Sequence, residues 1–224
     1  MIPLRDDIRS EKRPFVTWGL IAACTGAFIY QTLTEYQDPK AGELIVSAYG
    51  MIPTQIVSGH RLWTLFTSMF LHGGFFHIIG NMLYLWIFGD NVEDAFGHFW
   101  YLVVYLFTGM AGSLLQVVLM PGSSVPTIGA SGAISGIMGA YFVLFPRARV
   151  LTLVPIFFFI RLIYLPAPLL LGFWILIQVL NGYGSAPATG GGVAYFAHIG
   201  GFAAGIILGL VVRNRVRRPW YEIS

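Results

Sequence analysis

The sequence has few charged residues and almost no cysteine, and each scarcity excludes a class of protein. Asp, Glu, Lys and Arg together make up 10% of the 224 residues, whereas a soluble domain carries roughly a quarter. Cys24 is the only cysteine, so the chain can form neither an intrachain disulfide nor a cysteine-based metal site. With 56% hydrophobic residues and a mean hydropathy of +0.72, the chain is predicted to be an integral membrane protein.

The sequence also predicts neither a cleavable leader in its first apolar run nor a nucleic-acid-binding surface. The first 14 residues are polar and charged, and no small-residue cleavage pattern follows the first apolar run. We therefore interpret that run as a retained anchor and not as a signal peptide. The net charge is only +3, and the basic residues sit at the edges of apolar runs. A lipid bilayer is thus the expected partner, and no nucleic acid is predicted to bind.

Six apolar runs approach the length of about 20 residues that a membrane span requires. The fifth run is short and begins with Pro166 and Pro168, so its start is the least defined. The run Val150–Ile160 has only 11 residues between two arginines, which is too short to cross. We expect it to lie in the membrane interface or to pack as an extended segment. The six predicted spans are Phe15–Leu33, Phe70–Phe88, Phe99–Met120, Ile128–Phe145, Pro166–Leu180 and Ala194–Val212.

The positions of Lys and Arg predict the orientation of these spans, because cytoplasmic loops carry the excess of basic residues. With six spans, three basic groups fall on one side, whereas only Lys40 and Arg61 fall on the other. We therefore expect a cytosolic segment at 1–14, a six-helix domain at 15–212 and a basic cytosolic tail at 213–224, in the plasma membrane. The basic groups are Arg5, Arg9, Lys12 and Arg13; Arg147, Arg149 and Arg161; and Arg213, Arg215, Arg217 and Arg218.

Two long connections are then external. Thr34–Met69 contains Pro, Gly and aromatic residues, and it is expected to form a compact element at the membrane surface. Asn181–Val193 is rich in Gly and Ser and is expected to be mobile. The fold class predicted from this pattern is all-α, a polytopic bundle of six transmembrane helices.

Ser131 lies between glycines at the start of the fourth predicted span, in the segment Gly129–Gly132. Flanking glycines let the backbone approach a substrate carbonyl, and the free N–H groups of a helix N-terminus can bind an oxyanion. A serine in this setting is a candidate nucleophile when a base lies nearby. The alternative is a serine that packs helices together, because Ser131, Ser135 and Gly139 are spaced four residues apart.

His198 opens the sixth predicted span and is the candidate base. Ionisable side chains inside a membrane are costly and by default mark a working site, although a lone histidine can also be structural or part of a proton relay. Stripes of small residues on the fourth and sixth helices would allow close packing, which would place His198 beside Ser131. The stripes are Gly132, Gly136 and Ala140 on the fourth helix and Gly201, Gly205 and Gly209 on the sixth.

A third polar cluster, in the second predicted span, contains His77 and Asn81. These residues are four apart and share one helix face. Both can donate hydrogen bonds, which suits the stabilisation of an oxyanion, although they could instead hold the bundle together. The ten carboxylates are all expected in termini or loops, and no His-Glu-x-x-His pattern occurs, so we predict no metal and no acidic triad member. A Ser–His dyad that needs no cofactor remains.

These three motifs, in this order, resemble the rhomboid family of intramembrane serine proteases. They are His-x-x-x-Asn in the second span, Gly-x-Ser-Gly at the start of the fourth and Ala-His-x-Gly-Gly at the start of the sixth. The segment Gly89–Gly97, with Glu93 at its centre, is similar to the family's cytosolic turn after the second span. The resemblance extends from Phe15 to Val212 and implies a six-helix bundle around a water-filled cavity that opens to the external face.

The resemblance also implies a role for each polar residue. Ser131 would be the nucleophile and His198 the general base. The backbone N–H of Ser131 and the side chains of His77 and Asn81 would form the oxyanion site, and His72 would support the external loop. From the position of Glu93 at the cytosolic end, we expect it to cap or tie the loop there.

The function predicted from these residues is cleavage of transmembrane segments of other membrane proteins by a serine endopeptidase. Two alternatives from other classes remain open. One is a rhomboid-like protein that binds transmembrane clients without cleaving them, although members of that kind lack the serine or the histidine. The other is a small transporter that uses His77 and His198 as a proton relay, although the sequence has no inverted repeat or broken-helix pair.

Overall fold

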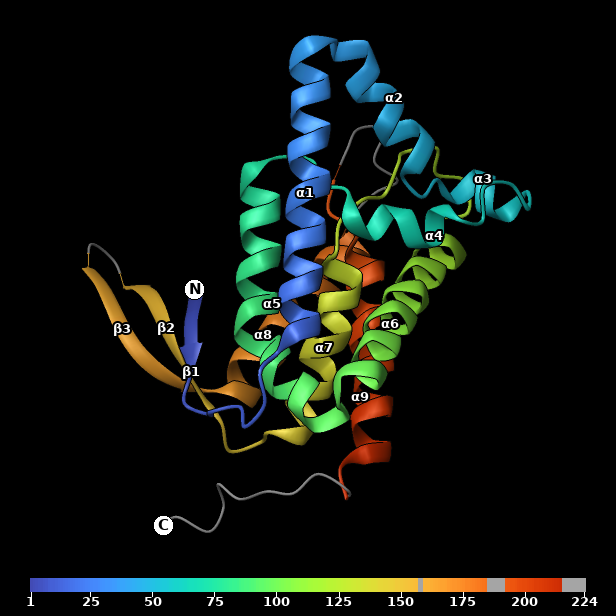
Figure 1. Cartoon of the computed structure of the whole chain (residues 1–224). Helices are drawn as coiled ribbons and strands as arrows, with labels where there is room; N and C mark the ends of the chain where they lie inside the picture. The colour runs from blue at the N-terminus through green and yellow to red at the C-terminus, as the bar shows by residue number, and fades with distance from the viewer. Residues whose placement is uncertain (157–158, 185–191, 215–224) are drawn as a thin grey trace.

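A computed structural model describes residues 1–156, 159–184 and 192–214, and helices form most of it (Figure 1). The long helices stand side by side, and a small sheet lies against one flank of the bundle. The strands are β1 (Ile2–Asp6), β2 (Arg149–Ile156) and β3 (Phe159–Pro166). The helices are α1 (Phe15–Gln37), α2 (Pro39–Tyr49), α3 (Pro53–Val57), α4 (Thr64–Thr67), the 3₁₀ turn η1 (Ser68–Phe70), α5 (Phe75–Phe96), α6 (His98–Leu119), α7 (Ser131–Leu144), α8 (Ala167–Gly184) and α9 (Tyr195–Val212).

Each of the six predicted spans overlaps a helix, although the bounds differ. Within the described ranges, four helices are long and apolar enough to cross a membrane, namely α1, α6, α8 and α9. The count reaches five if the segments Thr64–Phe70 and Phe75–Phe96, which are bent by 95° at a short break, form one span. The remaining helix, α7, has 14 residues and is about 21 Å long, less than the hydrocarbon thickness. The count of six spans therefore stays a prediction.

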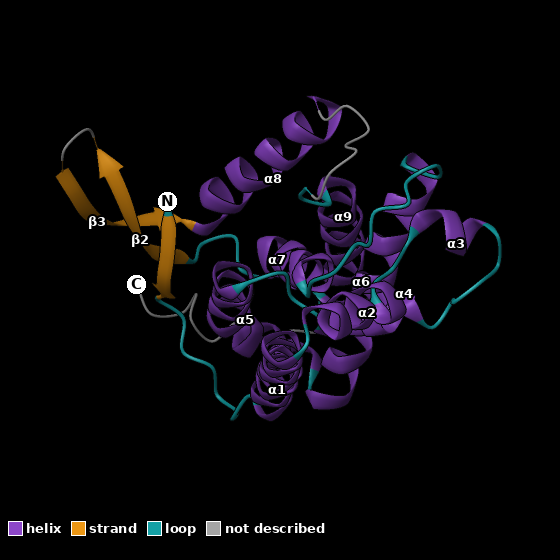
Figure 2. Ribbon diagram, turned by 90° about the horizontal axis from the view of Figure 1, so that it is seen from above, coloured by secondary structure: helices purple, strands orange, loops and turns teal. Residues whose placement is uncertain are grey.

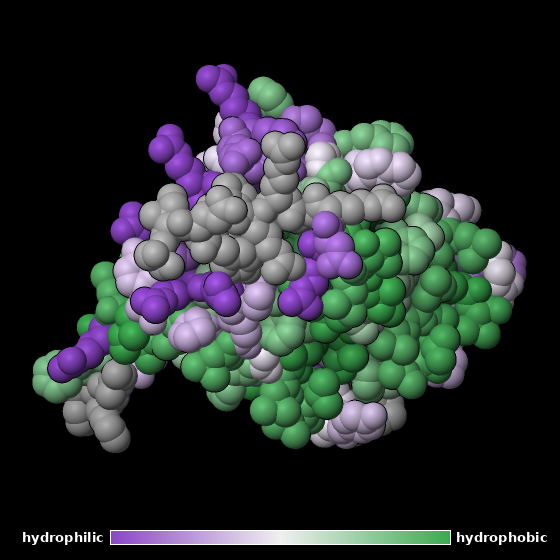
Figure 3. Space-filling view, turned by 90° about the horizontal axis from the view of Figure 1, so that it is seen from below, coloured by the Kyte–Doolittle hydropathy of each residue, from purple (hydrophilic) through white to green (hydrophobic). Residues whose placement is uncertain are grey.

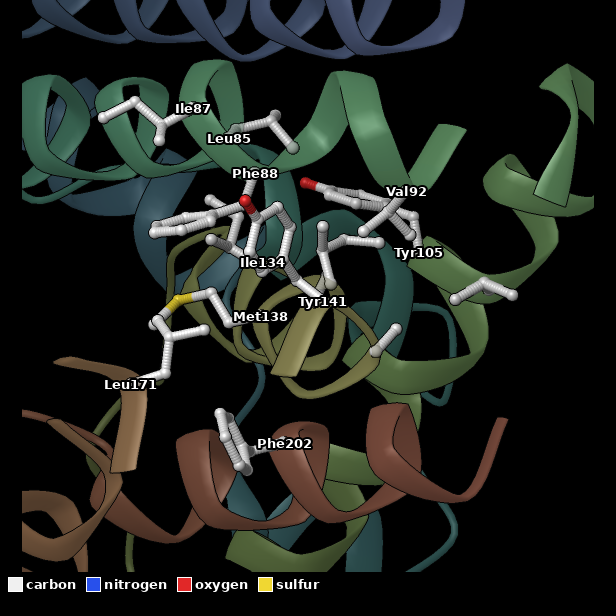
Figure 4. Close-up of a cluster of buried hydrophobic side chains, with 14 of the residues drawn as sticks. Leu85, Ile87, Phe88, Val92, Tyr105, Ile134, Met138, Tyr141, Leu171 and Phe202 are labelled. Atoms are coloured by element: carbon white, nitrogen blue, oxygen red, sulfur yellow. The ribbon is translucent and has the colours of Figure 1, made fainter. Parts of the chain in front are cut away.

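Helix α7 can be short because protein surrounds it. It lies in the middle of the bundle, among α5, α6, α8 and α9 (Figure 2), and 11 of its 14 residues are buried. Large side chains such as Phe88 of α5, Tyr141 of α7 and Phe202 of α9 fill the space between these helices (Figure 4). A helix with so little lipid contact need not match the bilayer thickness, and its first residue can lie below the membrane surface.

The all-α prediction is wrong at the flank of the bundle, where the three strands form an antiparallel sheet in the order β1-β2-β3. The described residues of the predicted extended segment Val150–Ile160 lie in β2 and β3, which pair antiparallel with Leu153 opposite Leu162. On its other side Leu153 is paired with Ile2. The sequence pattern did not predict β1 because its partner strand is distant in the chain, and strand pairing of this kind leaves no local signature.

The prediction that all carboxylates lie in termini or loops is also wrong, because α5 continues past its apolar run. Asp90, Glu93 and Asp94 lie in the last turns of this helix. Glu93 is 1% exposed, and its carboxylate accepts hydrogen bonds from the backbone N–H groups of Val16 at 2.9 Å and Thr17 at 2.8 Å. It therefore satisfies orphan donors at the N-terminus of α1, where a negative charge is favourable.

Two of the three predicted basic groups flank the start of α1 and the end of α9, which lie at the same end of the bundle (Figure 1), whereas Arg161 of the third group lies in β3 at the flank. Lys12 Nζ is 3.7 Å from Asp94 Oδ1 at the end of α5, and the backbone N–H of Arg149 donates to Asp7 Oδ1. Seen from this end, hydrophilic residues gather over one part of the face and hydrophobic residues border them (Figure 3). Three of the predicted tail arginines, at positions 215, 217 and 218, lie outside the described residues, as does most of the predicted loop Asn181–Val193.

Asp6, the last residue of β1, ties the sheet to the helices. Its Oδ2 accepts hydrogen bonds from Asn91 Nδ2 of α5 at 2.9 Å and from the Tyr141 hydroxyl of α7 at 2.6 Å. Burial raises the pKa of the Asp6 carboxyl to about 7, and the neighbouring carboxylates of Asp90 and Asp7 act in the same direction, against the Tyr141 hydrogen bond. The folded state thus binds this proton more tightly than the unfolded state does.

We expect the substitution Asp6→Asn to stabilise the protein relative to wild type by an amount that grows as the pH rises. Because the folded pKa lies above the unfolded value of about 3.9, wild-type stability falls between about pH 4 and pH 7. The asparagine can accept the same two hydrogen bonds without a buried charge. Thermal unfolding midpoints of both proteins between about pH 4 and pH 8 measure the effect, with the exposed Glu43→Gln as control. A difference between Asp6→Asn and wild type that is independent of pH would contradict this account.

Candidate active site

The structure brings Ser131 and His198 into hydrogen-bond contact. Ser131 is the first residue of α7, and His198 lies in the first turn of α9. The distance from Ser131 Oγ to His198 Nε2 is 2.7 Å. His198 is 8% exposed, so its imidazole is held in place by the surrounding helices. A hydroxyl and an imidazole at this distance have the geometry of a nucleophile and its base.

Close packing of α7 and α9 produces this contact. A Cβ atom added to Gly201 would collide with the backbone carbonyl oxygen of Gly132, and one added to Gly205 would collide with that of Gly136. The two helices therefore touch backbone to backbone along the stripes of small residues. Since His198 and Gly201 are three residues apart, they share a helix face, and this contact fixes the position of the imidazole over Ser131.

The second nitrogen of His198 contacts Gln178, a residue that the sequence did not single out. Gln178 belongs to α8 and is 8% exposed. Its Oε1 lies 2.8 Å from His198 Nδ1. The ring of Trp174, also on α8, lies beside the imidazole with 5.6 Å between ring centroids. The signal that could have indicated Gln178 is its isolation, because a polar side chain inside an apolar helix needs a partner.

His77 and Asn81 lie one turn apart on α5 and face the turn that precedes Ser131. Gly129 in this turn has φ +125°, a conformation that glycine adopts readily. A Cβ atom there would lie 2.7 Å from His77 Nε2 and 3.6 Å from Asn81 Nδ2. The glycine therefore lets the chain pass close to both side chains.

The polar atoms of His77 and Asn81 that face the turn are suited to donating hydrogen bonds. The backbone N–H of Gly73 donates to His77 Nδ1 at 3.3 Å, so in the neutral imidazole the proton resides on Nε2. Asn81 is 8% exposed, and its Nδ2 has no hydrogen-bond partner among the described residues. A buried donor without a partner is unusual and requires an explanation. An oxyanion beside Ser131 would supply the missing acceptor.

A cavity of about 780 Å³ joins these groups. Its lining includes Ser131, His198, His77, Asn81 and Trp174. The volume falls within the range of small-ligand pockets, so a short stretch of extended peptide can reach the serine. Within the described residues no group of three His, Cys, Asp or Glu side chains could hold a metal.

His72 lies beside this site without joining it. Its carbonyl oxygen accepts a hydrogen bond from Gln31 Nε2 at 3.0 Å, and its ring centroid is 5.2 Å from that of His77. The residue is fully buried. The hydrogen bond to Gln31 ties the segment before α5 to α1. His72 therefore has a structural role here.

Comparisons with known proteins agree on one family. A family model described as "Rhomboid domain" matches residues 59–215. The chain is 33% identical over 168 residues to RHOMBOID-like protein 6, mitochondrial, of Arabidopsis thaliana. The matched region covers 75% of this chain and 49% of that protein. It is 38% identical over 93 residues to Rhomboid protease GluP of Bacillus subtilis, which covers 42% of this chain and 18% of that protein.

A third relative is Rhomboid protein 1, mitochondrial, of Saccharomyces cerevisiae. The chain is 29% identical to it over 157 residues, which covers 67% of this chain and 42% of that protein. The chain thus spans about half the length of these relatives or less. Two of the three are named as mitochondrial and one is named as a protease.

Proposed function

The chain belongs to the rhomboid family, and we propose that it is an intramembrane serine endopeptidase that acts through Ser131 and His198. Its apolar helices and its family make it an integral membrane protein. The observation that carries the proposal is the 2.7 Å contact between Ser131 Oγ and His198 Nε2. The cavity that both residues line gives a peptide access to them.

In the proposed reaction, Ser131 Oγ attacks the scissile carbonyl carbon while His198 Nε2 takes the hydroxyl proton. The carbonyl oxygen becomes an oxyanion, which the Ser131 backbone N–H, His77 Nε2–H and Asn81 Nδ2–H can stabilise. His198 then gives its proton to the leaving amine as the C–N bond breaks. A water molecule, activated in the same way, hydrolyses the acyl-enzyme and restores the serine hydroxyl.

The proposed substrates are transmembrane segments of other proteins. Helical hydrogen bonds shield a peptide carbonyl, so the segment must unwind before Ser131 can reach it. Residues that destabilise a helix near the scissile bond should therefore favour cleavage. By resemblance to the family, a small residue is expected immediately before that bond.

We also propose that α5 and α7 complete a bundle of six spans, with both termini in the cytoplasm of a cell whose plasma membrane holds the protein. The basic residues before α1 and at the end of α9, at the same end of the bundle, support this orientation. The proposed division into a cytosolic segment 1–14, a helical domain 15–212 and a basic tail 213–224 follows from it. Reporter domains fused to each terminus would test this orientation. A reporter that is accessible from outside the cell would contradict it.

A fluorophosphonate probe tests the proposed nucleophile directly, since it labels only an activated serine. The matched control is Ser113→Ala, because Ser113 lines the same cavity from α6. We expect the probe to label the wild-type protein and this variant. Labelling should disappear in Ser131→Ala. A client-binding protein without activity, or a transporter, would show no labelling in any of the three proteins. Labelling that persists in Ser131→Ala would place the nucleophile elsewhere.

Substitutions of His77 and Asn81 should slow turnover without removing it. Loss of one oxyanion donor typically costs about 10²–10³ in rate, and the remaining donors still act. His77→Ala and Asn81→Ala should therefore lower kcat by roughly this factor, while Ser131 still reacts with the fluorophosphonate. If His77→Ala abolished labelling as completely as His198→Ala, then His77 would have a role in activating the serine, and the oxyanion assignment would be wrong.

A further inference from the structure

The contact between His198 and Gln178 determines which imidazole nitrogen carries the proton. Gln178 Nε2 donates to the backbone carbonyl oxygen of Trp174 at 3.3 Å, and a carbonyl oxygen can only accept. The amide nitrogen must therefore point along α8, and the amide oxygen must point to His198. Because that oxygen is 2.8 Å from His198 Nδ1, Nδ1 donates and Nε2 is left with its lone pair toward Ser131.

We propose that Gln178 is the positioning residue of the catalytic base, a role that rests on the proposed protease function. Its amide oxygen holds His198 in the tautomer and the orientation that remove the Ser131 proton. This is the place that a carboxylate occupies in a Ser–His–Asp triad. Gln178 does not line the cavity, so it acts on the substrate only through His198.

A neutral amide suits this position better than a carboxylate does. Gln178 is buried inside an apolar helix, where an ionised carboxylate would carry a large desolvation penalty. The amide orients the imidazole without that penalty, but it stabilises the imidazolium less than an anion would. The dyad predicted from the sequence thus has a third, uncharged member.

Both contacts to the outer side of the imidazole come from α8. Trp174 and Gln178 are four residues apart, so they project from the same face of this helix. Helix α8 lies at the edge of the bundle (Figure 2), and few of its residues are buried. Because α8 supplies both contacts, its displacement from α9 removes both at once. The basicity of His198 toward Ser131 is therefore coupled to the position of α8.

The substitution Gln178→Met tests this role because it keeps the side-chain volume and removes the acceptor. Imposing the wrong tautomer on a serine protease costs about 10⁴ in kcat. Methionine leaves the tautomer free, so we expect a smaller loss, about 10- to 10²-fold in kcat, with KM unchanged. The matched control is Leu171→Met, also buried on α8, which should retain activity. The proposal is wrong if Gln178→Met has the kcat of Leu171→Met at equal thermal stability.

The substitution Gln178→Glu tests the role through the pH dependence of kcat/KM. This dependence would not change if Gln178 had only a structural role. Burial disfavours an isolated carboxylate at this position, but a carboxylate paired with Nδ1 is compensated by the imidazolium and favours it, so the rise of kcat/KM with pH should shift to higher pH. The groups in contact with His198 are Ser131 from α7 and Trp174 and Gln178 from α8, and His77 from α5 lines the same cavity. If the rise of kcat/KM with pH does not shift in Gln178→Glu while Ser131→Ala is inactive, the proposed role of Gln178 is wrong. Activity in Ser131→Ala overturns the assignment of Ser131 as the nucleophile, and a wild-type protein without activity overturns the protease assignment itself.

Discussion

Replacing either Ser131 or His198 with alanine is expected to abolish proteolysis while the protein still folds. The Ser131 hydroxyl and the His198 imidazole are 2.7 Å apart, and no other serine of the described chain has such a contact with a histidine. Loss of a nucleophile or its base lowers kcat by as much as about 10⁶-fold in a soluble serine protease. Residual activity should therefore fall to background.

The measurement is cleavage of a single-span model protein with glycine and proline near one end of its transmembrane helix, by purified protein in liposomes. Losing one member of a catalytic unit costs about as much activity as losing all of them. The double variant should therefore have the same residual activity as either single variant. Thermal unfolding provides the folding control, since alanine at position 131 removes one side-chain hydrogen bond to His198, and alanine at position 198 removes that bond and the one to Gln178. Cleavage above background by Ser131→Ala would exclude this serine as the nucleophile.

The family and the main helices could be predicted from the sequence, because both depend on local patterns. Apolar runs of about 20 residues mark helices whatever surrounds them, and the predicted start of the first span, Phe15, is the first residue of α1. The prediction of the rhomboid family, made from three short motifs, is confirmed by a family model over residues 59–215. Small residues at spacing four indicated which two helices could meet.

The parts that could not be predicted depend on long-range contacts or on backbone conformation. The fourth span was predicted from Ile128, but α7 begins at Ser131 because Gly129 adopts a positive φ and turns the chain. Strand β1 was not predicted because its pairing with β2 brings together residues far apart in the sequence, such as Ile2 and Leu153. Gln178 was not predicted because the meaning of one amide in an apolar run depends on its partner, His198, on another helix.

A valine at position 201 is expected to lower activity and thermal stability together, although it touches neither Ser131 nor His198. A Cβ atom at Gly201 would collide with the backbone carbonyl oxygen of Gly132, and backbone cannot turn away as a side chain can. The helices must separate, and overpacking of this kind costs about 1–3 kcal/mol. A displacement of about 1 Å can lower the rate 10²-fold. We therefore expect at least this loss in kcat/KM.

The matched pair Gly201→Ala and Gly209→Ala separates the geometry of the site from packing in general. A Cβ atom at Gly209 would lie 2.5 Å from the side chain of Val143 and 3.1 Å from Ala140 Cα, so it meets no backbone atom as closely as one at Gly201 does, and this position lies two turns farther from His198. Gly209→Ala should thus retain most activity, whereas Gly201→Ala should lose both turnover and fluorophosphonate labelling of Ser131. Turnover and melting of Gly201→Val equal to those of wild type would mean that α7 and α9 do not meet along this stripe. The contact between Ser131 and His198 would then lose its structural basis.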